Sequence, residues 1–365
     1  MECLYYIALV LYSLIICFLY TGIRKNLRTL KKIGKSADMA VSVVLSVKNE
    51  EKYISRCLDA LLNQDYPKEL FEIIVVDDHS TDRTESILQH YKKHGNIRLI
   101  RANDHRYKSG KKSALTAGIK QANSELLLLT DADCVPSNSW MRSIVQLYNQ
   151  HIVLVAGFSP QQAAHAPLWN GFLLIDSLAA AFVAAGTIGW QRGVTCTGRN
   201  LSFRMPVFKQ VGEYEHLPDS VSGDDDFVLQ RISRNKCGKI LYALEVKSQV
   251  QSNGPGNFSK FLEQKTRHIS AGKFFGFWQK VFFAAFHLLN YFLWSALFTV
   301  FLSPLHALFL LVKILTDFIF MRAFANSLQR KINVAHFLLW EVLFPIYNAV
   351  SAPLAVRKKI NWKMN

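Results

Sequence analysis

Two pairs of acidic residues follow short apolar runs, and this pattern constrains the fold of the chain more than any other. Asp77 and Asp78 follow one run, and Asp131 and Asp133 follow a second run at 126–130. Each run is apolar on both faces and gives way at once to turn-forming residues, which predicts a buried parallel strand. Because ligands bind at the carboxyl ends of strands in an open α/β sheet, both pairs should line one crevice. Carboxylates there can hold a divalent cation, which prefers oxygen ligands and can in turn bind a phosphate.

Helix capping is the alternative interpretation of an acidic pair. The segment 78–82 contains Asp, Ser and Thr residues of the kind that begin helices. One pair alone would fit capping as well as ligand binding. Two pairs, each after a buried strand, favour a crevice for a nucleotide and a metal ion.

The spacing of apolar residues predicts an α/β domain with a mostly parallel sheet. The predicted strands are 41–47, 71–76, 97–101, 126–130 and 152–158, and helical spacing is found at 51–62 and 227–232. Strands that alternate with helices of this length are typical of parallel sheets. We predict that this domain occupies residues 39–270.

Five motifs in this domain resemble those of the family 2 glycosyltransferases, which have the GT-A fold, and they occur in the family's order. The motifs lie at 75–82, 110–115, 131–133, 197–200 and 222–227. Several ordered motifs are a far more specific signal than a single glycine-rich loop. The resemblance implies a GT-A domain, Rossmann-like in its sheet, that takes a sugar from a nucleotide-sugar.

The resemblance also implies roles for individual residues. Asp133 and Asp131 would hold Mg²⁺ or Mn²⁺, which neutralises the diphosphate leaving group. Asp225 would be the general base that deprotonates the acceptor hydroxyl, with Asp224 beside it. The residues expected to bind the nucleotide-sugar are Asn49, Glu50, Asp77, Asp78, Lys111, Asp131, Gln264 and Arg267. The residues expected to line the acceptor and the donor sugar are Thr197, Gly198, Asn200 and His268.

Residue chemistry supports some of these roles and leaves alternatives to others. The three consecutive carboxylates at 224–226 raise one another's pKa values, which suits proton transfer. Acidic residues also favour the first turn of a helix, so both interpretations of 224–226 can hold at once. Lys111 lies in a basic segment, and a solvated surface lysine is the alternative interpretation there.

The segment 264–268 resembles the Gln-x-x-Arg-Trp motif of the family, with His268 in place of the tryptophan. Gln264 and Arg267 are three residues apart and would share a helix face. Arg267 could clamp a diphosphate with its guanidinium group. In polymer-forming relatives the tryptophan helps to hold the acceptor sugar, so its absence weakens the case for a processive enzyme.

The N-terminus predicts a membrane anchor. Residues 3–23 are apolar and match the length of about 20 residues that crosses a bilayer. No basic residue precedes this stretch and six follow within 24–35, the reverse of a secretory signal peptide. By the positive-inside rule the chain after the anchor is cytoplasmic. We predict an anchor at 1–23, a basic linker at 24–38 and a cytoplasmic catalytic domain.

The C-terminal region 271–356 predicts further membrane helices. It contains three apolar stretches of spanning length, at 281–302, 304–321 and 334–355. Lys313 and Asp317 lie four residues apart and should pair on one helix face, whereas Glu341 has no evident partner.

The number of predicted spans in this region and the charge of the tail place the C-terminus on opposite sides of the membrane. Three spans after a cytoplasmic domain would leave the C-terminus outside, yet the basic tail 357–365 favours the inside. Either the charges of the tail do not determine the side of the C-terminus, or one of the three stretches is re-entrant. Pro345 makes the last stretch, 334–355, the candidate for a re-entrant segment. A fourth apolar stretch, 168–190, contains Asp176 and three glycines, so we predict a helix packed on the domain or in the interface.

Three functional hypotheses follow. The first is a multi-pass membrane glycosyltransferase that moves a sugar to a lipid or lipid-linked acceptor, non-processively and with a divalent cation. The second is a processive polysaccharide synthase that passes its product through the membrane helices. Three C-terminal segments with few polar residues are a poor basis for such a sugar-conducting channel. The third is a non-catalytic protein that uses its net charge of +16 to bind anionic lipid or nucleic acid. We predict membrane lipids and no nucleic acid as partners, since the basic residues gather beside the anchor and the third hypothesis leaves the aspartates unexplained.

Overall fold

A seven-stranded sheet forms the centre of the domain in the computed structural model, which describes residues 1–34, 37–102, 110–163, 166–215, 217–218, 220 and 222–357. The strand order is β3-β2-β1-β4-β8-β6-β9, and within the described residues only β8 runs against its neighbours. The strands are β1 Val41–Val47, β2 Phe71–Asp77, β3 Ile97–Arg101, β4 Leu126–Leu129, β6 Ile152–Gly157, β8 Leu201–Arg204 and β9 Lys239–Ala243. A small second sheet joins β5 Cys134–Pro136, β10 Val250–Asn253 and β7 Gln161–Gln162. The predicted α/β architecture and its five strands are confirmed.

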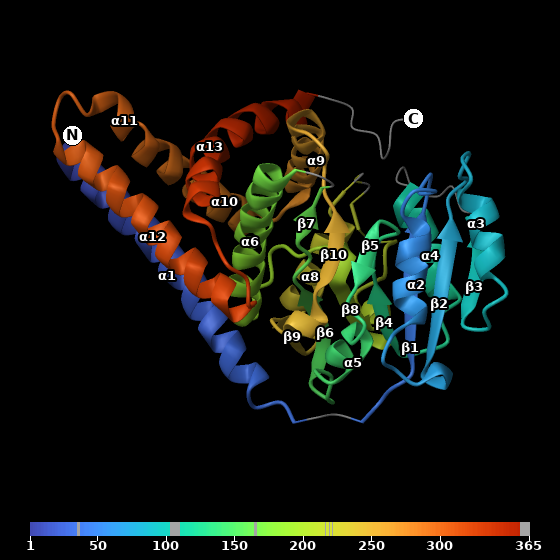
Figure 1. The fold of residues 1–365 in the computed structure, drawn as a ribbon. Coiled ribbons are helices and arrows are strands. Elements are labelled where there is room, and N and C mark those ends of the chain that lie inside the picture. Colours follow the sequence, from blue (N-terminus) through green and yellow to red (C-terminus); the bar gives the residue numbers. More distant parts are fainter. Residues whose placement is uncertain are drawn as a thin grey trace.

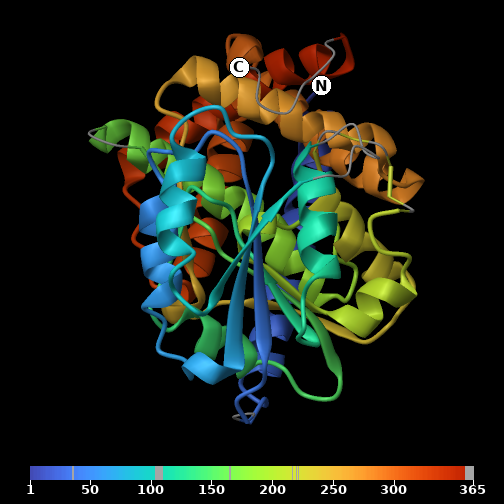
Figure 2. The same ribbon diagram turned by 90° about the vertical axis from the view of Figure 1, so that its right-hand side faces the viewer.

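Helices cover both faces of the sheet (Figure 2). The helices of the domain are α2 Ile54–Leu62, α3 Thr84–Tyr91, α4 Gly110–Lys120, α5 Trp140–Val145, α6 Pro167–Gly189, α7 Met205–Gln210, α8 Asp224–Arg234 and α9 Phe258–Ala271. Central strand β1 is buried along its whole length and sends alternate residues to two hydrophobic clusters. Val43 packs with α2 and α5 on one face, and Val44 packs with α4 on the other. Burial on both faces explains why the strand is apolar throughout.

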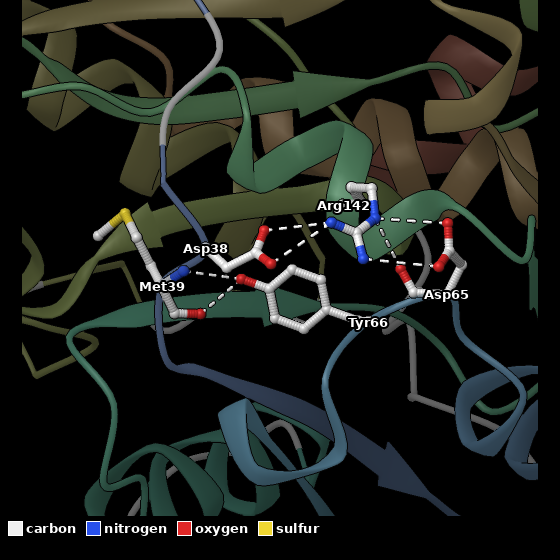
Figure 3. A network of polar contacts seen from close by, with 5 residues as sticks. All are labelled: Asp38, Met39, Asp65, Tyr66 and Arg142. Carbon is white, nitrogen blue, oxygen red and sulfur yellow. Dashed lines mark hydrogen bonds and ion pairs between the residues drawn. The ribbon is translucent and has the colours of Figure 1, made fainter.

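The chain enters β1 through a fixed network of polar contacts (Figure 3). The Arg142 guanidinium lies 3.3 Å from Asp38 and 3.4 Å from Asp65. The Tyr66 hydroxyl accepts from the Met39 backbone N–H at 2.8 Å and donates to the Met39 carbonyl at 2.7 Å. These contacts hold the chain at the point where the sequence predicts that the catalytic domain begins.

Helix α1, Glu2–Leu30, is part of the packed structure and continues beyond residue 23, the predicted end of the anchor. Its buried side crosses α6 at glycines. The two backbones are so close there that a β-carbon on Gly22 would lie 2.0 Å from the Gly186 carbonyl oxygen. The buried Asn26 side chain then bonds β9, donating to the Tyr242 carbonyl at 2.8 Å and accepting from its N–H at 3.1 Å. An edge strand of the sheet is thereby covered by the end of a membrane-type helix.

We expect Gly22→Ala to destabilise the protein by about 1–3 kcal/mol, because the added methyl group meets backbone that cannot move aside. A glycine-to-alanine change inside a helix normally has the opposite sign and stabilises by about 1 kcal/mol. Thermal unfolding in detergent measures the difference. Gly34→Ala is the matched control, since nothing lies within 4 Å of a β-carbon there. An unchanged or higher melting temperature for Gly22→Ala would contradict the close crossing of α1 and α6.

Four helices in the described part of the chain are long and apolar enough to cross a membrane, namely α1, α6, Phe277–Thr299 and Val334–Val356. The C-terminal helices are α10 Phe277–Trp294, α11 Ala296–Thr299, α12 Leu305–Ser327 and α13 Val334–Arg357. Helix α6 packs on the domain, as predicted from 168–190, and 72 % of its most apolar 18-residue stretch is buried. Helix α12 is not among the four, although it runs along α1 (Figure 1). The basic tail from residue 358 lies outside the described residues.

A buried charged cluster joins α1, α12 and α13. Lys313 lies 3.0 Å from Asp317 on the same helix, which confirms the predicted pair. Lys313 also contacts Glu341 of α13, so the expectation that Glu341 lacks a partner was wrong. The Tyr12 hydroxyl of α1 donates to Asp317 at 2.8 Å. The N-terminal helix and two C-terminal helices thus share one set of polar contacts inside an apolar bundle.

Candidate functional site

A cavity of about 290 Å³ lies beyond the carboxyl end of β4, between the sheet, α6, α8 and α9. It gathers ten of the residues predicted for the site. They are Lys111, Asp131, Asp133, Thr197, Gly198, Asp224, Asp225, Gln264, Arg267 and His268. These residues come from five separate segments, and the fold alone brings them together.

Four predicted nucleotide-binding residues lie at the neighbouring strand ends and not in the lining of this cavity. The Asn49 side chain accepts from the Thr81 N–H at 2.8 Å, and Asp77 accepts from the Ser80 hydroxyl at 2.5 Å. The other two are Glu50, whose N–H donates to Thr84, and Asp78, which lies 3.5 Å from the Lys48 ammonium. β1 pairs with both β2 and β4, so these side chains share the same edge of the sheet as the cavity. The contacts fix the turns around a place where a nucleoside could lie.

Asn200 is buried, with 1 % exposure, and does not line the cavity. Its amide donates to the Phe158 and Ser248 carbonyls at 3.0 and 2.8 Å, and its oxygen accepts from the Trp140 indole at 3.0 Å. The amide group therefore ties the cavity wall to the residue that follows β6, to α5 and to the short 3₁₀ helix Val246–Ser248 before β10. The sequence motif at 197–200 does not distinguish this supporting position from a lining one.

The acidic pair after β4 faces a lysine from the start of α4. The Lys111 ammonium lies 2.6 Å from Asp131. Burial alone would raise the pKa of Asp131, but Lys111 and two nearby arginines hold it below its usual value. Burial and the Asp131 carboxylate raise the pKa of Asp133. Asp133 is thus a half-buried carboxylate beside another negative charge, an arrangement that a bound cation relieves.

The two carboxylates fit a divalent cation that is shared with a substrate. No group of three or more His, Cys, Asp and Glu side chains in the described residues has the arrangement of a protein-only metal site. Mg²⁺ is commonly held by one or two carboxylates, with the remaining positions taken by water and phosphate oxygens. Asp131 and Asp133 supply such a pair of ligands, and the cavity leaves room for a diphosphate beside them.

The three consecutive aspartates begin α8, and each faces a different group. Gly223 precedes them with φ of 90°, where a side chain would be strained and would also meet Ala271. Asp225 accepts from the Gly198 N–H at 2.6 Å, and Asp226 accepts from the Cys196 N–H at 2.9 Å. Burial and the Asp225 charge raise the pKa of Asp226 well above its usual value.

Asp224 lies deeper than its neighbours, 3.8 Å from the ammonium of the buried Lys112. All three aspartates line the cavity, and both Asp225 and Asp226 are held by backbone N–H groups of the facing segment 196–198. Asp225 differs from Asp226 in its donor, which is the N–H of Gly198 in the 197–200 motif.

Helix α9 presents the predicted Gln264, Arg267 and His268 to the cavity. Burial lowers the pKa of Arg267, which the carboxylates of Asp131 and Asp133 partly offset. His268 is exposed at the surface of the cavity, where desolvation and the surrounding cations lower the pKa of its imidazole well below the usual value, so the ring is neutral near pH 7. A neutral ring at this position can pack or hydrogen-bond but cannot add positive charge.

Arg199, Asp176 and Lys265 also line the cavity, and they were not among the predicted site residues. Arg199 donates to the Ser252 hydroxyl at 2.9 Å and lies near the acidic pair, and its place inside the 197–200 motif was a signal for it. Asp176 of α6 and Lys265 of α9 form an ion pair of 2.5 Å in the cavity wall. The signal for Asp176 was a lone acidic residue in an apolar stretch, but its partner cannot be found by spacing.

The amino-acid sequence matches a known family model over residues 42–174, described as glycosyl transferase family 2. The chain is 29 % identical over 196 residues to "Probable glycosyltransferase YdaM" of Bacillus subtilis (strain 168), covering 53 % of this chain and 45 % of that protein. It is 33 % identical over 113 residues to a Methanococcus voltae protein, covering 30 % of this chain and 34 % of that protein. The latter is named a dolichyl N-acetyl-alpha-D-glucosaminyl phosphate 3-beta-D-2,3-diacetamido-2,3-dideoxy-beta-D-glucuronosyltransferase. The chain spans less than half the length of both relatives.

A solved structure shares the fold over nearly the whole chain. It is the mannosyltransferase PcManGT from Pyrobaculum calidifontis, in complex with GDP-Man and Mn²⁺. The TM-score is 0.56 with 17 % sequence identity, and the match covers 94 % of this chain and 99 % of that one. The predicted GT-A fold is confirmed.

Proposed function

We propose that this chain, whose residues 42–174 form a family 2 glycosyltransferase domain within a GT-A fold, moves a sugar from a nucleotide-sugar to a lipid or lipid-linked hydroxyl. One observation carries the proposal. A single cavity brings together the acidic pair Asp131 and Asp133, the guanidinium of Arg267 and the carboxylate of Asp225. A cation site, a diphosphate partner and a base are the groups that this reaction requires.

The donor end of the cavity is the part around Asp131 and Asp133. A divalent cation held there would take up the charge that develops on the departing diphosphate. Lys111 and Arg267 add two cations on the protein side, and a guanidinium can bind phosphate oxygens in pairs. The structure with GDP-Man and Mn²⁺ supports this assignment through its shared fold.

The base acts on the acceptor. Asp225 is fixed by the Gly198 N–H, so its carboxylate has a defined direction in the cavity. It would take the proton from the acceptor hydroxyl as that oxygen attacks the anomeric carbon of the donor sugar. The proton passes to Asp225 and the electron pair of the broken bond leaves with the diphosphate.

The acceptor side of the proposal rests on the apolar wall and on His268. Helix α6 lines the cavity with small and apolar residues and packs against membrane-type helices on its other sides. A lipid-linked acceptor suits such a wall, and the Methanococcus voltae relative is named for a dolichyl N-acetyl-alpha-D-glucosaminyl phosphate. His268 in place of tryptophan favours the non-processive form of the reaction over a polysaccharide synthase.

A screen of nucleotide-sugars against purified protein tests the proposed reaction. We expect slow hydrolysis of one donor class in the presence of Mg²⁺ or Mn²⁺, since family enzymes lacking an acceptor can pass the sugar to water. The released nucleotide diphosphate is measured by liquid chromatography. Failure to hydrolyse or transfer any UDP-, GDP- or dTDP-sugar would contradict the proposal and favour a non-catalytic membrane protein.

We also propose that α1, α10 with α11, and α12 cross the bilayer, while α13 does not. Tyr5 of α1 stacks on Phe292 of α10, and Tyr12 stacks on Phe286, so these two helices run antiparallel. Tyr5 also faces His306 of α12, and Tyr12 faces Asp317, so α12 runs parallel to α1. Of the charged residues of α12, Lys313 and Asp317 are paired inside this bundle, and Arg322 lies over the Phe318 ring.

Contacts at both ends of α13 support a helix that stays on the side of the catalytic domain. Just before it, the Leu328 carbonyl accepts from Gln249 of the domain at 3.0 Å. At its end, the Val356 carbonyl accepts at 3.3 Å from Lys273, which directly follows α9. Figure 1 shows α13 crossing the direction of α1 and α12 and ending beside α9. This path leaves the end of α13 on the side of the catalytic domain, which agrees with the basic residues of the sequence at 357–365.

Single cysteines test this topology, in a background where the exposed Cys3 and Cys17 are replaced by serine. We expect a membrane-impermeant maleimide to label Leu302→Cys in intact spheroplasts. Lys93→Cys, Lys331→Cys and Val356→Cys should react only after permeabilisation, because they lie on the cytoplasmic side. Labelling of Val356→Cys from outside would show that α13 crosses, and labelling of Lys93→Cys from outside would overturn the orientation of the whole domain.

A further inference from the structure

We propose that Asp176 and Lys265 form a binding subsite for the hydroxyl groups of a sugar ring on the acceptor. The proposal rests on the proposed function and adds to it the class of acceptor, a neutral saccharide unit attached to a lipid. Asp176 lies in α6 and Lys265 lies in α9, and both line the cavity that contains Asp131 and Asp225.

Two helices, α9 and α13, hold the Asp176 carboxylate in one orientation. Lys265 lies 2.5 Å from one oxygen. The Tyr347 hydroxyl of α13 donates to the other oxygen at 2.7 Å, and the Trp340 indole lies 3.5 Å from it. The side chain is 3 % exposed, and Asp176 is the only charged residue in the 23 residues of α6. A carboxylate oriented from several sides inside an apolar helix is an arrangement suited to binding a ligand.

Stability alone does not account for this ion pair. Removing a carboxylate and an ammonium from water costs several kcal/mol for each ion, and an apolar pair of similar volume is often as stable or more stable. Here the pair also lines the cavity, although Asp176 itself is buried. The Lys265 side chain is 18 % exposed, and its ammonium lies over the Phe261 and Tyr347 rings. An ammonium has three donors, of which Asp176 occupies one.

The chemistry of the pair matches hydroxyl groups. A hydroxyl both donates and accepts, so a fixed carboxylate and ammonium side by side can bind two neighbouring hydroxyls of a sugar ring. The charges of Asp176 and Lys265 cancel, which favours a neutral group at this end of the cavity over a phosphate. By contrast, Arg267 and Lys111 lie beside the acidic pair at the donor end.

The surrounding wall leaves space for a ring. Beside Asp176 the lining of α6 consists of small side chains, Ser177, Ala180, Ala181 and Ala184. Lys265 and Arg267 both line this cavity from α9. A ring held by the pair would therefore lie between α6 and α9.

Binding of alkyl glycosides to the full chain in lipid nanodiscs tests the subsite directly. The probes are octyl glycosides that each carry one sugar, with a polyprenyl phosphate as the parallel ligand, and calorimetry measures the dissociation constants. We expect one octyl glycoside to bind, and Asp176→Asn and Lys265→Met to weaken it by about 10–100-fold, the loss of a charge-assisted hydrogen bond. The same two substitutions should not weaken the binding of the polyprenyl phosphate together with that of the glycoside.

Two further variants separate ligand binding from packing. Ala180→Leu adds bulk to the α6 lining and removes neither charge of the ion pair, and it should weaken glycoside binding by a similar factor. Tyr347→Phe removes one contact that orients Asp176 but no ligand-facing group, so we expect a change of less than about threefold. If Tyr347→Phe weakens binding as much as Asp176→Asn, the pair acts through helix packing and the proposal is wrong.

The remaining outcomes are equally decisive. Unchanged glycoside binding in well-folded Asp176→Asn and Lys265→Met would overturn the subsite. Selective loss of polyprenyl phosphate binding in Lys265→Met would instead identify a phosphate site. Because binding is measured without a donor, this result stands apart from the nucleotide-sugar screen, so the subsite and the transfer reaction can fail separately.

Discussion

Asp133→Ala should abolish sugar transfer, with a loss of at least about 10³-fold, while the protein stays folded and in the membrane. The reason is that a metal ion at the leaving diphosphate contributes several kcal/mol to the transition state, and each 1.4 kcal/mol is tenfold in rate. Asp133 is half of the carboxylate pair proposed to hold that ion. Release of nucleotide diphosphate and formation of labelled glycolipid measure the loss.

Removal of divalent ions from the parent protein should reproduce the effect of Asp133→Ala. Asp65→Ala is the control, since Asp65 is an exposed aspartate outside the cavity. Full transfer by the parent in excess chelator would exclude the metal from the mechanism.

The metal requirement should also depend on pH. Burial and Asp131 raise the pKa of Asp133, and a cation binds the deprotonated carboxylate. As pH falls through this raised pKa, protons compete with the metal, so the Mn²⁺ concentration for half-maximal transfer should rise by up to about tenfold per pH unit. A requirement for Mn²⁺ that stays constant between pH 8 and pH 5 would contradict this role for Asp133.

Asp225→Asn should bind nucleotide-sugar and metal about as well as the parent but transfer the sugar more slowly by a factor of about 10²–10⁴. Asparagine keeps the shape of the side chain and can still accept from the Gly198 N–H, but it cannot take a proton. Because the base acts on the acceptor, donor affinity should be nearly unchanged. Single-turnover transfer rates and donor binding, measured on the same preparation, separate the two quantities.

The neighbouring aspartates provide matched controls for the Asp225 assignment. The raised pKa of Asp226 favours its protonated form, which an amide resembles, so Asp226→Asn should be mild. Asp224→Asn weakens the pairing with the buried Lys112 and should lower the melting temperature more than it lowers the transfer rate of folded protein. If Asp225→Asn keeps parental turnover while one of the other two variants is inactive, the base has been assigned to the wrong aspartate.

Local patterns in the sequence carried most of the fold. The strands at 41–47, 71–76, 97–101, 126–130 and 152–158 were predictable because strands buried on both faces require uninterrupted apolar residues. The acidic pair at 131–133 was predictable as a cavity feature because strand ends in an α/β sheet meet at one edge. The roles of these residues in the reaction remain predictions.

Some features could not be derived from spacing, because they depend on which helices meet. Glu341 has its partner Lys313 on another helix, 28 residues away. Asn200 lies in a motif that was expected to line the cavity, but three groups from distant segments hold its side chain in the interior. Asp176 and Lys265 pair across 89 residues, and neither position alone indicates a partner.

The sequence by itself determined the α/β class, the order of the strands along the chain, the apolar helices and the acidic motifs at the strand ends. These follow from periodicity and from the chemistry of single segments, which act over a few residues. The tertiary structure alone decided that α1 covers the edge of the sheet, that α13 returns to the catalytic domain and that α6 supplies a wall of the cavity. Such choices depend on close helix crossings and buried polar pairs, whose energies exist only once distant segments are packed together.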